Sequence, residues 1–283
     1  HYHGDLMSAW PRRLPCPVSV HFGKPMPADS STRDIRWAIE ELSVNYFNAK
    51  KSSRYSLGET FVKTCRSNWR KPCMSDTTGK RLTFGRTLVA AVALADKIEV
   101  QTAGQKNIGI FLPSSVAGAL ANYATALLNK TAVNLSYTAS ESDRAYMIET
   151  AEIRTVLTSR TFLEKLNISA ETLPGAVMME DLIGGLTSKD KRKAFVKARF
   201  GCRKKLAAVT KDFDPNDTAV ILFSSGSSGR PKGVQLSHHN IQGDIECALT
   251  VFKVFKNDKL CGILPFFHSF GLTCTMWLPL VAG

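Results

Sequence analysis

The sequence has no pair of cysteines spaced C-x-x-C, although seven cysteines occur among its 283 residues. They are scattered along the chain and odd in number, which argues against a zinc site and against a disulfide framework. We therefore expect reduced thiols in a cytosolic setting. The cysteines are Cys16, Cys65, Cys73, Cys202, Cys247, Cys261 and Cys274.

The sequence also lacks a secretory signal peptide and a long hydrophobic run. Its most apolar helical stretch, Val116 to Leu128, is too short to cross a bilayer and contains Asn122 and Tyr123, so we expect a buried helix there. The first residue is not Met, and the chain stops in an apolar stretch. We expect both ends to be cuts through a longer protein.

The positive charge of the chain is concentrated in one segment. The formal net charge is +13, and much of it lies between Lys189 and Lys211. No aromatic platform or nucleic-acid motif accompanies this segment, so nucleic-acid binding is the weakest interpretation. A solvated helix face explains the segment most simply. Contact with anionic lipid or with an acidic carrier protein is the alternative.

Residues 1–50 are expected to be the end of a domain that lies mostly upstream. The run Pro17 to Gly23 is β-like, and a helix follows it, with Ser31 and Asp34 resembling a capping box. One strand and one helix cannot bury a core of their own. A polar linker at residues 51–56 then separates this tail from the second part. The apolar face of the helix consists of Ile35, Ala38, Ile39, Leu42 and Tyr46.

Residues 57–283 are predicted to form an α/β domain with a mainly parallel sheet flanked by helices. Strand-like and helix-like segments alternate along the chain, which is typical of that fold class. A hairpin is expected first, around Thr77–Lys80. The predicted strands are 107–112, 132–135, 155–158 and 218–223, and the predicted helices are 114–128 and 140–151.

The stretch SSGSSGRPKG follows the apolar strand at 218–223. Its glycines allow backbone N–H groups to converge on an anion, its serines add donors and Lys232 adds a mobile positive charge, so the stretch is a candidate phosphate cradle. The common G-x-x-x-x-G-K-[ST] spacing fails, because Pro231 stands where the second glycine is required. A flexible Gly/Ser loop is the alternative interpretation.

A returning strand at Lys232–Leu236 and a helix with Ser237 as N-cap are expected next. His238 and His239 fall in the first turn of this helix, where capping or packing explains them better than a role as a base. His239 and Asp244 also match H-x-x-x-x-D, an acyltransferase signature, but positions five apart do not share a helix face. We interpret that match as chance. The expected buried face is Ile241, Ile245, Ala248, Leu249 and Phe252.

A further strand is predicted at Leu260–Leu264, ending at Pro265, with the sequence FFHSFG directly after it. His268 lies between aromatic residues, on a loop that follows the carboxyl end of the predicted strand. Open α/β sheets bind their ligands at such places. A histidine packed in the core is the alternative.

Two motifs in this order resemble the adenylate-forming superfamily, which includes acyl-CoA synthetases and luciferases. TAVILFSSGSSGRPKGVQLSHHNI is similar to its phosphate-binding signature, and LPFFHSFG is similar to its next motif. The resemblance implies that one set of residues holds the ATP phosphates and that a second set lines the route to the fatty-acyl carboxylate. The phosphate set is Ser224, Ser225, Gly226, Ser227, Ser228, Gly229 and Lys232; the acyl set is Phe267, His268 and Gly271, with His268 as the catalytic residue.

The resemblance also implies ATP and Mg²⁺, with the magnesium ligand expected outside these residues. The reaction would join a fatty acid to AMP and then to a carrier thiol of acyl carrier protein or CoA. Because later motifs of the superfamily are missing, we expect the chain alone to bind nucleotide weakly and not to adenylate. The alternative is a non-catalytic nucleotide- or membrane-binding module that uses residues 189–211.

Residues 11–43 resemble the end of a PlsC-type acyltransferase domain. Such a fusion is similar to the bifunctional 2-acylglycerophosphoethanolamine acyltransferase/acyl-[acyl-carrier-protein] synthetases. That resemblance implies a lysophospholipid as the final acceptor, reached through the upstream acyltransferase domain. It also implies a place in the cytoplasm at the inner face of the bacterial membrane.

Overall fold

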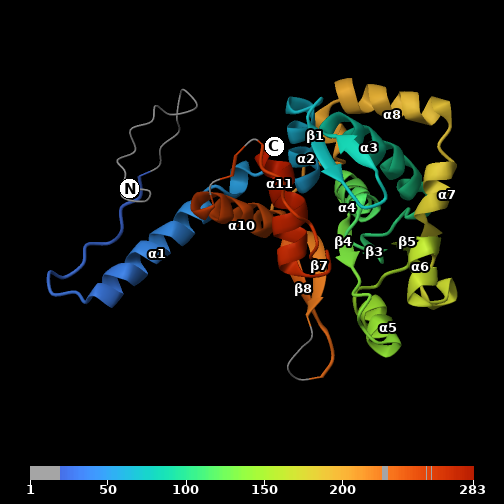
Figure 1. Ribbon diagram of the computed structural model, residues 1–283. Helices are drawn as coiled ribbons and strands as arrows, with labels where there is room; N and C mark the ends of the chain where they lie inside the picture. The colour runs from blue at the N-terminus through green and yellow to red at the C-terminus, as the bar shows by residue number, and fades with distance from the viewer. Residues whose placement is uncertain (1–19, 225–228, 253, 256) are drawn as a thin grey trace. The chain divides into compact units, whose positions relative to one another are not determined.

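The structure, a computed structural model, describes residues 20–224, 229–252, 254, 255 and 257–283 (Figure 1). The chain divides into two compact units, His1–Lys51 and Ser52–Gly283. Each unit is described by itself. Among the described residues, no helix is long and apolar enough to cross a membrane.

In the first unit, one helix, α1 (Thr32–Ala49), begins where the sequence predicts it. The Ser31 side chain accepts a hydrogen bond from the Asp34 backbone N–H at 3.2 Å, which caps the helix. None of its side chains is buried, and the expected apolar face is open, with Ile39 58% exposed. The strand predicted at Pro17–Gly23 is wrong over Val20–Gly23, which form exposed irregular backbone; residues 17–19 lie outside the described residues.

The second unit alternates strands and helices, as predicted. Its strands are β1 (Pro72–Ser75), β2 (Arg81–Thr83), β3 (Asn107–Ile110), β4 (Thr131–Asn134), β5 (Val156–Thr158), β6 (Ala176–Met178), β7 (Thr218–Ser224) and β8 (Lys232–Ser237). Its α-helices are α2 (Leu57–Ser67), α3 (Phe84–Gln101), α4 (Val116–Leu127), α5 (Glu141–Thr150), α6 (Arg160–Leu166), α7 (Met179–Gly184), α8 (Ser188–Phe200), α9 (Arg203–Leu206), α10 (His238–Val251) and α11 (Leu278–Ala282). Short 3₁₀ turns occupy η1 (Lys51–Ser53) and η2 (Ala170–Thr172), and η3 (Gly271–Trp277) is a π-helix.

Six strands form one sheet in the order β6-β5-β3-β4-β7-β8. Strands β3, β4, β5, β6 and β7 run parallel to one another, and β8 runs antiparallel beside β7. The predicted α/β fold with a mainly parallel sheet is therefore confirmed. Strands β1 and β2 form the expected hairpin apart from this sheet. Because parallel strands share one carboxyl edge, the residues that follow β3, β4, β5 and β7 gather at the same side of the sheet.

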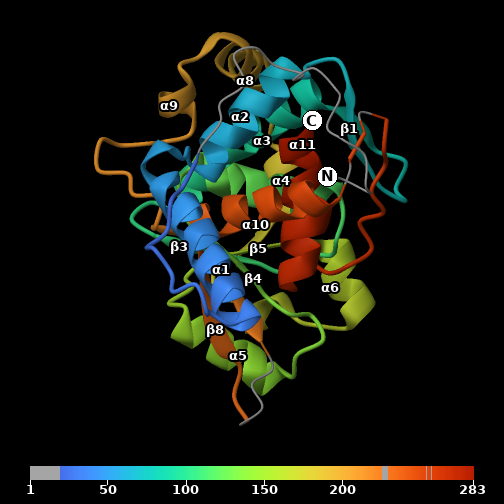
Figure 2. The same ribbon diagram turned by 90° about the vertical axis from the view of Figure 1, so that its left-hand side faces the viewer.

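Strand β7 is buried on both faces, which explains its continuous apolar run. Val220 and Leu222 join the core under α2, α3 and α4, whereas Ile221 and Phe223 join a second core with residues of α5 and α6. Successive side chains of a strand point to opposite faces, so every position of a strand that is covered on both sides is buried and favours an apolar residue. Figure 2 shows α2 and α3 above the strands and α5 below them.

Helix α4 is fixed on the sheet by a buried pair of amides. Asn122 Nδ2 donates to Asn134 Oδ1 at 3.0 Å, and Asn134 Nδ2 donates to Asn122 Oδ1 at 2.9 Å. Both side chains are almost completely buried; Asn122 Nδ2 also donates to the Gly118 carbonyl at 3.0 Å, whereas Asn134 depends on Asn122 for its partner. Ser115 caps the helix by accepting from the Gly118 N–H. The predicted buried helix is confirmed.

Helix α8 and its basic residues pack against α3. Ala194 and Ala198 are fully buried, while Lys197 Nζ contacts the Asp96 carboxylate at 2.7 Å. Arg203 of α9 contacts the buried Glu59 at 3.2 Å. Part of the positive charge that appears unopposed in the sequence is therefore balanced by carboxylates far away along the chain.

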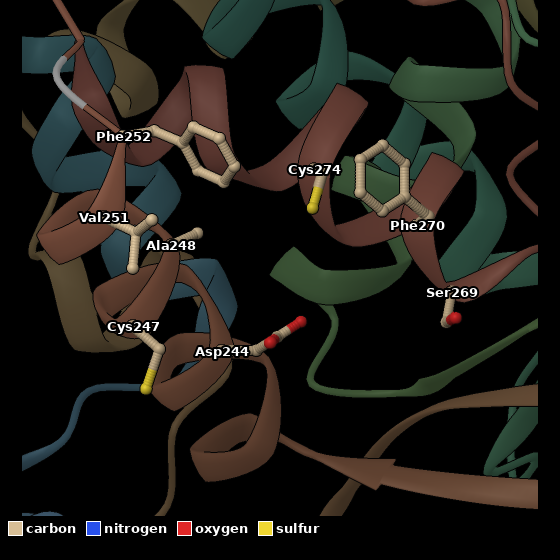
Figure 3. Close-up of a pocket in the computed structure, with 8 residues that line it drawn as sticks. All are labelled: Asp244, Cys247, Ala248, Val251, Phe252, Ser269, Phe270 and Cys274. Atoms are coloured by element: carbon tan, nitrogen blue, oxygen red, sulfur yellow. The ribbon is translucent and has the colours of Figure 1, made fainter.

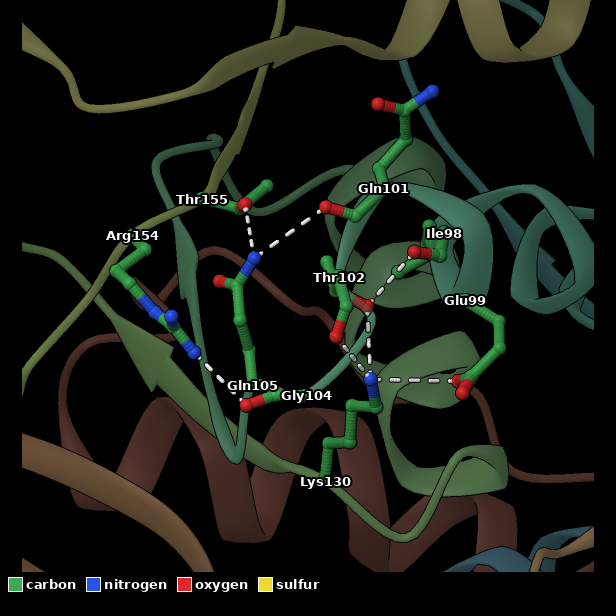
Figure 4. A network of polar contacts seen from close by, with 9 residues as sticks. All are labelled: Ile98, Glu99, Gln101, Thr102, Gly104, Gln105, Lys130, Arg154 and Thr155. Atoms are coloured by element: carbon green, nitrogen blue, oxygen red, sulfur yellow. Dashed lines mark hydrogen bonds and ion pairs between the residues drawn. The ribbon is translucent and has the colours of Figure 1, made fainter.

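Another lysine closes the end of α3 (Figure 4). Lys130 Nζ donates to the Thr102 carbonyl at 2.6 Å and to its hydroxyl at 3.0 Å, and it contacts Glu99 at 3.4 Å. A positive charge at a helix C-terminus opposes the partial negative charge of the last carbonyls. Beside it, Gln105 Nε2 donates to Thr155 Oγ1, which ties the turn before β3 to the start of β5.

His238 is a buried packing residue, as the sequence indicates. Its Nδ1 accepts a hydrogen bond from the Leu57 backbone N–H at 3.1 Å, and its ring meets Phe213 edge-on at 5.2 Å. Burial lowers the pKa of His238 from 6.5 to about 4, although Asp217 acts to raise it. The imidazole is therefore neutral in the folded chain at pH 7.

The His238 pKa predicts a loss of stability in mild acid. The unfolded chain takes up a proton below pH 6.5 while the folded chain stays neutral until about pH 4, so unfolding becomes easier as the pH falls through this window. We expect the free energy of unfolding to fall by roughly 2 kcal/mol from this group between pH 7 and pH 5. Urea unfolding at the two pH values measures the difference.

His238→Asn is the matched variant, because an amide oxygen can accept from the Leu57 N–H but does not titrate. We expect most of this fall to disappear in His238→Asn. An equal fall in both proteins would show that other groups cause it.

Candidate functional site

The candidate phosphate cradle starts at the carboxyl end of β7. Ser224 is the last residue of the strand and is exposed, and it pairs in register with Lys232, the first residue of β8. The returning strand predicted at Lys232–Leu236 is thus confirmed, and the two ends of the cradle lie side by side. Gly229 has φ = +110°, a conformation that favours glycine, and a Cβ placed there would meet no atom within 4 Å.

Four of the predicted cradle residues, Ser225, Gly226, Ser227 and Ser228, lie outside the described residues. The segment that follows them, just before β8, contacts α5. The guanidinium of Arg230 lies over the ring of Tyr146 at 4.9 Å. The sequence prediction did not include this pair, because it joins residues far apart along the chain.

The FFHSFG bend lies beside the carboxyl end of β4, the strand next to β7. Phe267 is buried, and its ring meets Tyr137, three residues beyond β4, at 4.8 Å. Ser114 Oγ, from the segment after β3, donates to the Leu264 carbonyl at 2.8 Å. Two strand ends of the sheet therefore hold the bend, and His268 lies exposed on it, with its ring 4.7 Å from that of Phe267.

The strand predicted at Leu260–Leu264 is wrong. These residues form irregular backbone, and Ile263 is 77% exposed. An apolar run suggests a buried strand only if another strand is free to pair with it. Among the described residues, this segment pairs with no strand and is attached instead by the Ser114 side chain.

Gly271 is buried where the bend turns into η3. A Cβ at this position would collide with the Pro265 carbonyl oxygen and approach the Leu264 oxygen at 3.0 Å. The His268 backbone N–H also donates to the Pro265 carbonyl at 3.1 Å, so that carbonyl cannot move away freely. Gly271 thus keeps the turn tight.

We expect Gly271→Ala to destabilise the chain by about 2 kcal/mol, since overpacked positions typically cost 1–3 kcal/mol. Gly262→Ala, on the same segment, is the control, because its Cβ would have no neighbour closer than 4.0 Å. Urea unfolding followed by circular dichroism compares the two. Equal stability of both variants would contradict the assigned role of Gly271.

A cavity of about 360 Å³ lies between α10 and η3 (Figure 3). Burial raises the pKa of the Cys274 thiol, and the nearby Asp244 carboxylate raises it further. Of the predicted acyl-binding residues, Phe267, His268 and Gly271 do not line this cavity, whereas their neighbours Ser269 and Phe270 do. The lining residues are Asp244, Cys247, Ala248, Val251, Phe252, Ser269, Phe270 and Cys274.

The sequence analysis did not predict the wall of this cavity that α10 forms. Asp244, Cys247, Ala248 and Val251 recur at the spacing of one helix face, and that spacing was the available signal. The expected buried face is correct for Ile241 and Ile245 but wrong for Phe252, which is 67% exposed at the cavity. Periodicity finds a helix face but does not tell a face that packs from one that lines a cavity.

The H-x-x-x-x-D match does not form one site. His239 Nδ1 accepts from Arg54 Nε at 2.9 Å, beside the bidentate contact of Arg54 with Glu246. Asp244 faces the cavity instead. The two residues of the match thus have different surroundings, in agreement with its interpretation as chance.

The described residues of the candidate cradle offer groups that can bind an anion. Ser224 offers an exposed hydroxyl, Lys232 an exposed ammonium, and Gly229 open space, which together suit a polyanion. Within the described part of the chain, no cluster of three His, Cys, Asp or Glu residues could hold a metal.

The chain belongs to the family described as AMP-binding enzyme, whose model matches residues 61–283. It is 27% identical over 222 residues to a long-chain-fatty-acid–CoA ligase of Bacillus subtilis, covering 70% of this chain and 40% of the ligase. A probable 4-coumarate–CoA ligase of Dictyostelium discoideum is 48% identical over 75 residues, which is 25% of this chain and 13% of that protein.

Solved structures show the same fold. The o-succinylbenzoate coenzyme A synthetase of Bacillus subtilis in complex with AMP has a TM-score of 0.62 and 18% identity, over 79% of this chain and 53% of that one. ATP-bound MatB of Rhodopseudomonas palustris has a TM-score of 0.59 and 20% identity, and the match covers 80% of this chain and 44% of MatB. The chain thus spans about half the length, or less, of the proteins it matches.

Proposed function

We propose that this chain is part of an ATP-dependent acyl-activating ligase that acts on a fatty acid. The observation that carries the proposal is the pairing of Ser224 with Lys232 at the carboxyl edge of the sheet, within the segment that matches the family. The bend with His268 lies beside the neighbouring strand at the same edge. The position of the two motifs at one edge of the sheet supports the proposal that they serve one reaction.

In the proposed reaction, a fatty-acid carboxylate attacks the α-phosphorus of ATP, which gives acyl-AMP and pyrophosphate. Negative charge grows on the departing pyrophosphate as its bond to the α-phosphorus breaks. Lys232, Ser224 and the backbone around Gly229 would hold and stabilise that charge, a role for which fixed donors are well suited. Mg²⁺ would neutralise phosphate charge, with its ligand expected outside this chain.

The cavity between α10 and η3 is the proposed place for the acyl chain. Its wall is mostly apolar, and His268 directly precedes its lining residues Ser269 and Phe270. His268, the proposed catalytic residue, would meet the carboxylate, with Phe267 and Gly271 holding the bend that carries it. The name of the Bacillus subtilis relative supports a long-chain fatty acid as substrate.

The acceptor of the acyl group is proposed to be a carrier thiol. The names of the ligase relatives favour CoA, and acyl carrier protein is the second possibility. Transfer onward to a lysophospholipid, at the inner face of a bacterial membrane, rests on the acyltransferase resemblance of residues 11–43 alone. It would need the domain expected upstream.

Lys232→Ala tests the phosphate assignment. A charge-assisted hydrogen bond contributes roughly 1.5–3 kcal/mol, so we expect the dissociation constant for ATP to rise about 10- to 100-fold. Isothermal titration calorimetry measures it. Lys211→Ala removes the same charge from another exposed site and should leave ATP binding unchanged. Equal ATP affinity in Lys232→Ala and the parent chain would falsify the assignment.

Ala248→Trp tests the acyl assignment, because the indole would fill the cavity. We expect palmitate to bind about tenfold more weakly, corresponding to roughly 1.4 kcal/mol of lost contact. Ala103→Trp, on an exposed turn, is the control. Circular dichroism confirms that both variants are folded before palmitate binding is compared.

A second measurement needs no variant. Palmitate should slow alkylation of Cys247 and Cys274, which line the cavity, but not of the exposed Cys202. If palmitate protects none of these thiols, or all of them equally, the acyl chain does not occupy this cavity.

A further inference from the structure

Two segments without carboxylates meet at one end of the second unit. Residues 60–75 and residues 191–211 contain no Asp or Glu. Arg66, near the end of α2, joins them by donating to carbonyls at the end of α8. Its Nε reaches the Ala198 oxygen at 2.7 Å, and its Nη2 reaches the Gly201 oxygen at 2.7 Å. The cations of both segments are thereby brought together.

A cavity of about 490 Å³ lies at this junction. Arg66, Arg70, Lys71 and Arg199 line it, with Trp69 and Asn68 between them, and no acidic residue is part of its wall. Burial, and then the neighbouring Arg199, lower the pKa of Arg66. Four cationic groups around one polar hollow favour a phosphate group as ligand.

The charge of this cavity differs from that of the rest of α8. Lys193 and Lys197 are opposed by Asp96, and Arg203 is opposed by Glu59. Arg66 donates its hydrogen bonds to backbone carbonyls, which carry no net charge and do not neutralise its positive charge. The local excess of positive charge therefore remains at the cavity.

Exposed aromatic side chains stand around the same cavity. Phe200 is 73% exposed and Phe195 is 46% exposed. The Arg199 guanidinium lies over Trp69 at 5.4 Å and over Phe200 at 5.6 Å, and Phe195 meets Trp69 edge-on at 6.0 Å. Exposed aromatic rings that alternate with cations are typical of helices that lie in the headgroup region of a membrane.

We propose that this surface docks on a membrane that contains anionic phospholipids. The basic–aromatic surface consists of Arg66, Trp69, Arg70, Lys71, Phe195, Arg199 and Phe200. A lipid phosphate occupies the cavity, and Phe195 and Phe200 enter the boundary between headgroups and acyl chains. A free phosphate would match the charge but would leave the two phenylalanines without a role. In Figure 1, α8 lies at the top of the second unit.

Sedimentation with vesicles of phosphatidylcholine and phosphatidylglycerol tests the proposal, with neither ATP nor fatty acid present. Each basic residue near an anionic surface contributes about fivefold in partitioning, so Arg70→Ala/Arg199→Ala should weaken binding roughly 30-fold. Arg70→Lys/Arg199→Lys keeps the charge and should retain most of the binding. Phe200→Ala should show a loss that persists at 0.5 M salt, because salt screens charge but not apolar contact (Debye length of about 4 Å).

Lys106→Ala/Lys165→Ala is the matched control, since it removes two exposed positive charges elsewhere. Equal weakening by that control, or equal binding to pure phosphatidylcholine vesicles, would overturn the proposal. So would complete release by millimolar glycerol phosphate, which indicates a free phosphate ligand, or binding to polyglutamate without binding to vesicles. The unaltered chain gives the vesicle comparison even if a variant does not fold. Because no ATP is present, failure here leaves the ligase proposal untouched.

Discussion

Burial of β7 on both faces is the constraint on which the candidate site depends. Val220, Ile221, Leu222 and Phe223 are all buried, and burying a side chain of this kind contributes roughly 1.5–3 kcal/mol. The strand is therefore held firmly up to Ser224. Its antiparallel pairing with β8 returns Lys232 to the same edge, which sets where a polyanion can be gripped.

The second half of the site is held by side chains rather than by a strand. Phe267 packs on Tyr137, Ser114 holds the Leu264 carbonyl, and Gly271 permits a turn that no larger residue could make. Tyr137 and Ser114 each belong to a segment that follows a parallel strand, β4 and β3 respectively. The bend and the cradle thus depend on the same sheet, although they are far apart in the sequence.

The sequence was informative where local rules decide the structure. The alternation of strands and helices, the β7 run and the Ser237 cap all predicted elements that the structure contains. It failed where the structure depends on a partner. Leu260–Leu264 has the composition of a strand, but among the described residues no strand lies beside it. Phe252 has the spacing of the buried face of α10, but its side chain is exposed. The ion pairs of α8 could not be predicted, because their partners, such as Asp96 with Lys197, are about a hundred residues apart.

The reciprocal amide pair between α4 and β4 has a consequence for how the site tolerates change. If α4 slid by one turn or rotated on the sheet, both bonds between Asn122 and Asn134 would break in a dry interior; Asn122 would keep only its bond to the Gly118 carbonyl and Asn134 would lose its partner, at a cost of several kcal/mol. The amide pair therefore favours a single position of α4 on the sheet over small shifts of the helix. Ser114 and Ser115, at the start of that helix, inherit this fixed position, so mutations in the outer helices should leave the bend that carries His268 undisturbed.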